Sequence, residues 1–257
     1  MEPIIFAFAG KGGVGKTSLS AAFIRALTAR FPDKKLLAVD ADPAVGLLTA
    51  LGAEPELTLD DVRMKIAESI DRGDTADAVA LLGEARFHLL DCILERGNLS
   101  VLAIGRPEAA GCYCKVNAYL KQVLETVAGN YDFVVIDGEA GIEQINRRVM
   151  ETVTALVLVS DGSRKGVQVI KTICSVASRL MSPKKTGVIF NRVSPAFDPE
   201  KIEDLPPVLA LIGDDRNQTE NDMRGDTVFS LPADAPVLAG AEKALNMLLE
   251  GTPYALI

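Results

Sequence analysis

Short runs of consecutive apolar residues recur along the chain, and polar or glycine-containing segments separate them. These runs are shorter than a typical helix, and their lack of alternation is typical of strands that are buried on both faces of a sheet. We expect such strands at residues 4–8, 36–39, 99–104, 133–136, 155–159, 188–190 and 209–212. The pattern over residues 85–96 does not separate helix from strand.

The segments between these runs have helical periodicity. The clearest case is residues 58–71, where Leu59, Val62, Ile66 and Ile70 fall on one face of a helix. Other helices are expected over residues 18–29, 44–52, 116–127, 165–181 and 234–250. Strands that alternate with helices predict an α/β fold, with a mostly parallel central sheet of about seven or eight strands and helices on both faces. We expect one domain over residues 1–257, because no repeat or linker interrupts the pattern.

Composition and charge narrow the classes of protein. The chain has 257 residues, of which 48% are hydrophobic and 24% charged, and its net charge is −8. That charge disfavours non-specific binding to nucleic acid or to an anionic membrane. No apolar run approaches the roughly 18 residues of a membrane-spanning helix, and Glu2 lies where a signal peptide has basic residues. We therefore expect a cytoplasmic protein with no nucleic-acid or membrane partner.

The first expected strand leads into a glycine-rich segment, Gly10-Lys11-Gly12-Gly13-Val14-Gly15-Lys16-Thr17. Its spacing, G-x-x-x-x-G-K-T between a strand and a helix, is that of a phosphate-binding loop. Backbone N–H groups of such a loop and of the helix N-terminus surround phosphates, a lysine reaches the outer phosphates, and a threonine hydroxyl ligates Mg²⁺. The expected ATP- or ADP-binding residues are Gly12, Gly13, Val14, Gly15, Lys16, Thr17 and Ser18. A glycine turn that binds nothing is the alternative, which the flanking strand and helix disfavour.

Carboxylates follow two of the expected strands. Asp40 and Asp42 come after the second strand, and Asp137 comes directly after the strand at 133–136. In a parallel sheet these strand ends meet at the edge where ligands bind. Carboxylates beside a triphosphate can orient the attacking water or help to hold Mg²⁺. For Asp40 and Asp42, an ordinary solvated turn remains an alternative.

Lys11 adds a resemblance to this interpretation. A second lysine directly after the first glycine resembles the deviant Walker A ATPases, the class of nitrogenase iron protein, MinD, ParA and the arsenite-transport ATPase. The resemblance implies a P-loop ATPase with slow intrinsic turnover that works as a homodimer. It also implies that Lys11 crosses the dimer interface to the partner's nucleotide and that Asp42 orients the attacking water. Asp40 would then hold a water bound to Mg²⁺.

Two further segments carry the same resemblance. Residues 137–143, Asp-Gly-Glu-Ala-Gly-Ile-Glu, resemble the mobile switch segment of MinD-like proteins, which implies that Asp137 lies near Mg²⁺. Asn191 precedes Arg192 at the end of a strand, and in this class such an asparagine binds the adenine edge. The class usually has I-P-x-D/N after a late strand, which would make Asp215 a base contact. This chain has Gly213 in place of the proline, which leaves that contact and the nucleotide selectivity open.

Cys112 and Cys114 form a Cys-x-Cys pair, which is a weak signal by itself because two thiols can also be buried or incidental. Two thiolates cannot complete a four-sulfur site, but a two-fold dimer would bring two more. Such a site suits Zn²⁺, Ni²⁺ or an iron–sulfur cluster. The other chemically distinctive side chains match no motif, and we expect Cys92 and Cys174 to be core thiols and His88 to be structural.

The surroundings of the cysteine pair resemble one family in particular. Residues 105–114, Gly-Arg-Pro-Glu-Ala-Ala-Gly-Cys-Tyr-Cys, are similar to the CooC family when taken together with residues 10–17 and 137–143. These are nickel-insertion ATPases that mature carbon monoxide dehydrogenase. The resemblance implies that Cys112 and Cys114 bind Ni²⁺ or Zn²⁺ across a homodimer. The implied client is carbon monoxide dehydrogenase or a related metalloenzyme.

The rival interpretation is a MinD- or ParA-like positioning or partition ATPase without a metal site. A MinD-like protein binds the membrane, which needs an amphipathic helix with a basic face near the C-terminus. The last expected helix offers only Lys243 against Glu242 and Glu250. The sequence therefore favours the metallochaperone.

Overall fold

The computed structural model describes residues 2–73, 75–105, 114–138, 149–150, 152–180 and 182–255. Its centre is an eight-stranded sheet in the order β3-β4-β2-β5-β1-β6-β7-β8. Every neighbouring pair is parallel except β3 and β4, which pair antiparallel. The strands are β1 Ile4–Gly10, β2 Leu36–Asp40, β3 Ile93–Arg96, β4 Leu99–Ala103, β5 Phe133–Asp137, β6 Ala155–Ser160, β7 Lys185–Phe190 and β8 Val208–Leu211. The predicted α/β fold with a mostly parallel sheet is confirmed.

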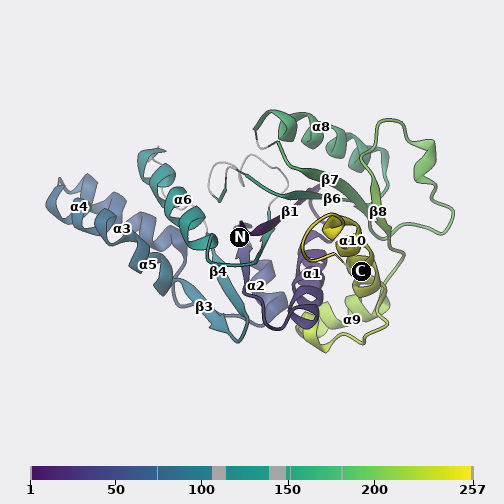
Figure 1. The fold of residues 1–257 in the computed structure, drawn as a ribbon, viewed down its shortest axis with the longest axis horizontal. Helices are drawn as coiled ribbons and strands as arrows, with labels where there is room; N and C mark the ends of the chain where they lie inside the picture. Colours follow the sequence, from purple (N-terminus) through teal and green to yellow (C-terminus); the bar gives the residue numbers. More distant parts are fainter. Residues whose placement is uncertain are drawn as a thin grey trace.

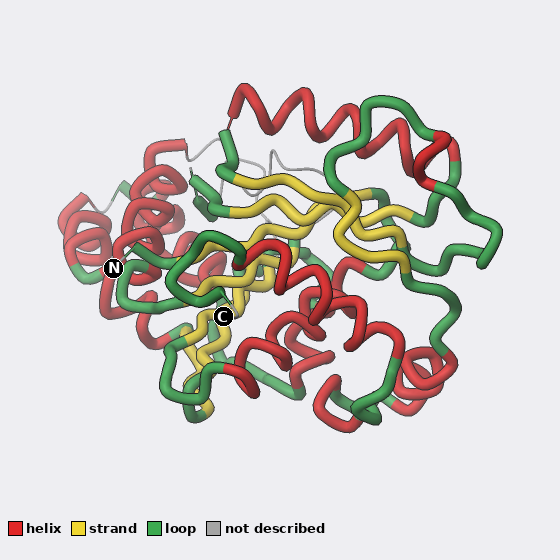
Figure 2. Tube along the Cα trace, turned by 45° about the vertical axis from the view of Figure 1, so that its right-hand side comes forward, coloured by secondary structure: helices red, strands yellow, loops and turns green. Residues whose placement is uncertain are grey.

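Helices cover both faces of the sheet, as the tube in Figure 2 shows. They are α1 Lys16–Arg30, α2 Gly46–Leu51, α3 Leu59–Asp71, α4 Thr75–Gly83, α5 Ala85–Asp91, α6 Cys114–Ala128, α8 Arg164–Leu180, α9 Arg216–Arg224 and α10 Pro236–Leu249. Short 3₁₀ turns lie at Pro199–Lys201 and Val228–Ser230. In Figure 1, α3, α4 and α5 extend at one end of the molecule, and β8 and α9 lie towards the other.

Two apolar cores form because each central strand buries both of its faces. Along β1, Phe6 and Phe8 belong to one core, and Ala7 and Ala9 to the other. The first core packs against α1, α2 and α10, and the second against α3, α5, α6 and α8. Burial of both faces explains why these strands are continuous apolar runs in the sequence. None of the helices in the described part of the chain is long and apolar enough to cross a membrane.

The ambiguous residues 85–96 contain two elements. A short helix, α5, is followed after Cys92 by β3, which forms a hairpin with β4. Gly97 and Asn98 make the two-residue turn, and Gly97 has a φ of 63°, in the left-handed region that glycine adopts without penalty. Because residues 85–96 are divided between a helix and an edge strand, their apolar positions follow neither the helical nor the strand periodicity throughout.

The register of the sheet brings the ends of three strands together. Asp40 at the end of β2 lies beside Asp137 at the end of β5, and Asp137 lies beside Phe8 of β1. The glycine-rich segment therefore leaves the sheet next to both carboxylates. This edge of the sheet is where the candidate site lies.

Candidate functional site

The glycine-rich loop connects β1 directly to α1. A Cβ atom on Gly10 would lie 2.1 Å from the carbonyl oxygen of Val159, so only glycine fits there. Gly15 has a φ of 91°, and a Cβ atom on it would lie 2.5 Å from Nδ2 of Asn191. The loop opens a pocket whose lining residues are Gly12, Gly13, Gly15, Lys16, Thr17, Asp42 and Arg192. Lys16 is buried, and its Nζ donates to the carbonyl of Lys11 at 3.3 Å.

Thr17 and Asp137 contact each other at the edge of the sheet where β2 and β5 end. The Thr17 hydroxyl donates to Oδ2 of Asp137 at 2.7 Å, while Oδ1 of Asp137 is buried without a hydrogen-bond partner among the described residues. Burial, helped by the nearby Asp40 carboxylate and opposed by the Thr17 hydrogen bond, raises the pKa of Asp137 to about 7. An unpaired buried carboxylate oxygen beside a threonine hydroxyl suits a hard divalent cation such as Mg²⁺. These two side chains fit the predicted Mg²⁺ site.

Asp40 is fully buried, but both of its oxygens bind backbone. Oδ1 accepts from the Asp42 N–H at 3.1 Å, and Oδ2 accepts from the N–H groups of Leu47 and Leu48 at 2.9 and 3.2 Å. Burial raises the pKa of Asp40 to about 6 despite these hydrogen bonds. Asp40 thus fastens the segment after β2 to the sheet. Its expected contact with a Mg²⁺-bound water remains a prediction.

Asp42, two residues after the end of β2, lines the pocket at the glycine-rich loop. Its Oδ1 accepts from the N–H of Ala44 at 2.8 Å, which closes a tight turn. Three residues later, Val45 has a φ of 54°, a left-handed conformation that is strained for a β-branched side chain. The segment after β2 is thus a tight turn, and it places Asp42 in the lining of the same pocket as Lys16 and Thr17.

Lys11 makes an ion pair within its own chain. Its Nζ lies 3.0 Å from Oδ2 of Asp161, just beyond β6, with the two side chains 36% and 32% exposed. Asp161 Oδ1 accepts from the backbone N–H and the hydroxyl of Ser163 at 3.1 and 2.7 Å. The Ser163 hydroxyl and then the Lys11 ammonium lower the pKa of Asp161 to about 2. Asp161 was not predicted from the sequence, although it directly follows a buried strand and Asp40 and Asp137 end such strands.

The two predicted base contacts lie together in a second pocket. It adjoins the phosphate pocket through Arg192, and its lining residues are Ser18, Asn191, Arg192, Gly213, Asp214, Asp215, Gln218, Thr219 and Val237. Asn191 Nδ2 donates to the carbonyl of Val14 at 2.9 Å. Asp215 accepts from the N–H of Gln218 at 3.1 Å and from that of Val237 at 2.9 Å, so it joins α9 to α10. Both residues hold the pocket together, and their contact with a base remains a prediction.

Arg192 and Gln218 line the second pocket, and neither was predicted from the sequence as a site residue. Arg192 has a left-handed backbone with a φ of 57°, and its Nη1 donates to the carbonyl of Gly13 at 3.3 Å. Its position directly after Asn191 was a signal that could have found it. Gln218 lies in a polar helix that carries no motif, so no pattern in the sequence indicates it.

The cysteine pair lies largely outside the described residues. Cys112 is not among the described residues. Cys114 is the first residue of α6, and the side chain of Cys114 is not described. Among the described residues, no group of three or more histidine, cysteine or acidic side chains could hold a metal ion. Cys92 is a buried core thiol, as expected, and burial raises its pKa to about 11. Cys174 is half-buried against the same core.

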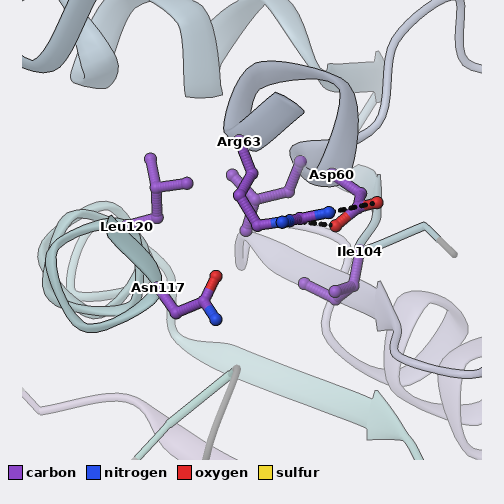
Figure 3. Close-up of a pocket in the computed structure, with 6 residues that line it drawn as sticks. Asp60, Arg63, Ile104, Asn117 and Leu120 are labelled. Atoms are coloured by element: carbon purple, nitrogen blue, oxygen red, sulfur yellow. Dashed lines mark hydrogen bonds and ion pairs between the residues drawn. The ribbon is translucent and has the colours of Figure 1, made fainter. Parts of the chain in front are cut away.

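A separate cavity lies between α3, α6 and the end of β4 (Figure 3). Its charged wall is an ion pair in which Nε and Nη2 of Arg63 donate to the two oxygens of Asp60 at 2.6 and 3.2 Å. Both side chains are only 8% exposed. Asn117 faces the pair from α6, and Ile104 and Leu120 complete apolar parts of the wall. The cavity shares no lining residue with the phosphate pocket.

Comparison with known proteins places this geometry in a family. The profile of the CobQ/CobB/MinD/ParA nucleotide binding domain matches residues 5–228. The chain belongs to this family. It is 33% identical over 252 residues to an uncharacterized ATP-binding protein of Methanocaldococcus jannaschii, an alignment that covers 96% of this chain and 98% of that protein. This CobQ/CobB/MinD/ParA family member is thus a nucleotide-binding protein of the P-loop class.

More distant sequence and structural similarities are consistent with membership of this family. The chain is 29% identical over 208 residues to the carbon monoxide dehydrogenase accessory protein CooC of Rhodospirillum rubrum, covering 72% of this chain and 78% of that protein. The solved structure of septum site-determining protein MinD from Pyrococcus horikoshii, in complex with Mg-ADP, superposes with a TM-score of 0.68 at 23% identity and full coverage of both chains. MinD from Pyrococcus furiosus gives a TM-score of 0.67 at 23% identity, covering 96% of this chain and all of that one. The two structural likenesses show the fold alone.

Proposed function

We propose that this chain is an ATP-dependent nickel-insertion ATPase that matures carbon monoxide dehydrogenase or a related metalloenzyme. The observation that carries the proposal is the occurrence, in one chain, of a fully formed phosphate loop and the Cys112–Cys114 pair. The similarity to CooC over most of the chain supports it. Nickel is the cargo, and ATP binding and hydrolysis control its transfer.

The nucleotide part of the proposal rests on the strand-end geometry. The loop and the buried Lys16 would bind the phosphates, and Thr17 and Asp137 would hold Mg²⁺, which neutralises phosphate charge when bound. Asp42 faces the same pocket and would orient the attacking water. Asp42→Asn should therefore bind ATP but hydrolyse it much more slowly.

Dimerisation is the second part of the proposal. Lys11 would exchange its ion pair with Asp161 for the nucleotide of a partner copy, which makes the closed homodimer the hydrolytic form. The Lys11–Asp161 pair is about one-third exposed, so it costs little to open. Lys11→Ala should bind ATP as a monomer, whereas Lys16→Ala should lose ATP affinity. Light scattering with ATP separates the two; equal loss of nucleotide binding in both would contradict a role for Lys11 across the interface.

The metal part is tested by equilibrium dialysis against Ni²⁺ and Zn²⁺. Two subunits supply four sulfurs, so we expect one metal ion per dimer, bound as thiolates and released at low pH. Cys112→Ala and Cys114→Ala should each abolish this stoichiometry while ATP hydrolysis largely survives. Cys174→Ala is the matched control, because Cys174 packs against the second core and belongs to no cysteine pair in the sequence.

The alternative function, a MinD- or ParA-like positioning ATPase without a metal site, is the other outcome of this test. Unchanged metal stoichiometry in both alanine variants, or no metal binding by the wild-type protein, would favour it. The structural likenesses fit either function, because both use this fold.

A further inference from the structure

A glutamine in the lining of the second pocket has a buried side-chain oxygen. Oε1 of Gln218 is buried and accepts no hydrogen bond from the described residues. Gln218 lines this pocket together with Ser18, which follows Thr17 of the phosphate loop, and with Arg192, which lines both pockets. A buried acceptor without a donor is costly to the protein, so its presence beside the phosphate pocket calls for a ligand that donates to it.

The orientation of the Gln218 amide is fixed by a second residue. Its Nε2 lies 2.7 Å from Oδ1 of Asp222, one helical turn further along α9. A carboxylate only accepts hydrogen bonds, so the atom beside Asp222 must be the NH₂ group and the buried atom must be the oxygen. With its NH₂ group held by Asp222, Gln218 has its oxygen, and not a donor, left to bind a ligand.

Two other side chains of this pocket, Asn191 and Asp215, already make hydrogen bonds within the protein. Asn191 Nδ2 donates to the phosphate loop, and both Asp215 oxygens accept from backbone N–H groups. Gln218 Oε1 is the buried acceptor of this wall that these contacts leave open.

We propose that Gln218 is the residue that selects adenine, by accepting a hydrogen bond from the 6-amino group through Oε1, and that Asp222 positions it. This inference rests on the proposed nucleotide-binding function and names its base specificity. A 6-oxo purine would place an acceptor against an acceptor. A purine with hydrogen at position 6 would leave Oε1 unpaired. Both should bind more weakly than the 6-amino purine.

The test is isothermal titration of the full chain with three Mg²⁺-nucleoside diphosphates, which avoid hydrolysis. They are ADP, IDP with a 6-oxo group, and purine riboside diphosphate with hydrogen at position 6. Wild type should prefer ADP over each of the others by about tenfold or more. In Gln218→Met the ratio should fall towards one. In Asp222→Ala the freed amide can turn its NH₂ group inwards, so IDP should gain affinity relative to ADP.

Asn217→Met is the matched control. It makes a similar change at an exposed neighbour that does not line the pocket, and it should keep the wild-type ratio. A wild-type ratio near one, or an unchanged ratio in Gln218→Met, would overturn the inference while leaving nucleotide binding intact; a water that satisfies Oε1 would give the latter result. Failure of wild type to bind ADP would overturn the proposed function as well.

Discussion

Asp137 and Asp60 are both buried aspartates near the same edge of the sheet, but their surroundings differ. Both carboxylate oxygens of Asp60 accept hydrogen bonds from Arg63, which lies three residues later in α3. Asp137 accepts a hydrogen bond from Thr17 with one oxygen, its other oxygen has no hydrogen-bond partner among the described residues, and burial raises its pKa to about 7. A buried charge that is fully paired holds a structure together, whereas one that is left unpaired costs stability unless a ligand completes it. The comparison separates a structural charge in the α3–α6 region from a binding site beside the phosphate loop.

The largest expected effect comes from breaking the structural pair. Arg63→Met leaves the Asp60 carboxylate buried without its partner, and we expect a loss of about 3–5 kcal/mol in the free energy of unfolding. Urea denaturation measures it. The double variant Asp60→Leu/Arg63→Met should recover most of the loss because no charge remains buried. ADP affinity should be unchanged in both variants; a large change in it would contradict the separation of the two regions.

The pH dependence of stability should reveal the unpaired carboxylate. Because the pKa of Asp137 is raised in the folded state, the folded protein binds more protons than the unfolded chain between about pH 4 and 7. Stability without nucleotide should therefore fall as pH rises through this window and level off above it. A pKa raised by roughly three corresponds to a change on the order of 4 kcal/mol in the free energy of unfolding across this pH window.

Asp137→Asn should remove most of this slope and leave the smaller part that ends near pH 6, where Asp40 titrates. Urea midpoints measured at intervals from pH 4.5 to 8 provide the comparison. A slope that is the same in wild type and Asp137→Asn would show that Asp137 is already ionised and compensated without a ligand.

The smallest effect on stability is expected at Asp161. Asp161→Asn removes the charge that pairs with Lys11 while Asn Oδ1 can still accept from Ser163, so the loss should be below about 1 kcal/mol. If Lys11 acts on a partner's nucleotide, freeing it should let the ATP-dependent dimer form at lower protein concentration. Light scattering across a dilution series checks this. Weaker dimerisation in the variant would mean that the pair orients Lys11 for its task and does not restrain it.

The sequence was most informative where both faces of a strand are buried. Such strands, for example β1 and β5, are unbroken apolar runs, and the glycine spacing after β1 has a geometric cause at Gly10. It failed for α5 and β3, where two short elements share an apolar run. Local pattern cannot assign such a run, since the pairing of β3 with β4 decides it.

The site was predicted less completely than the fold. Residues with motifs, such as Lys16, Thr17 and Asp137, do lie together. Asp161 and Arg192 were missed although each follows a strand end that the sequence does indicate, and the contacts that bring them to the site join segments far apart in the chain. Gln218 belongs to no motif, and its distinguishing feature is a buried oxygen without a hydrogen-bond partner among the described residues. Sequence spacing carries no information about such contacts.

Asp137, whose Oδ1 has no hydrogen-bond partner among the described residues, is the central residue of the proposed Mg²⁺–nucleotide site. Calorimetric titration of ADP with and without Mg²⁺ tests this directly. Wild type should bind ADP more tightly with Mg²⁺, and Asp137→Asn should bind ADP with nearly the same affinity whether Mg²⁺ is present or not. An Asp137→Asn variant with the full Mg²⁺ dependence of wild type would contradict the account.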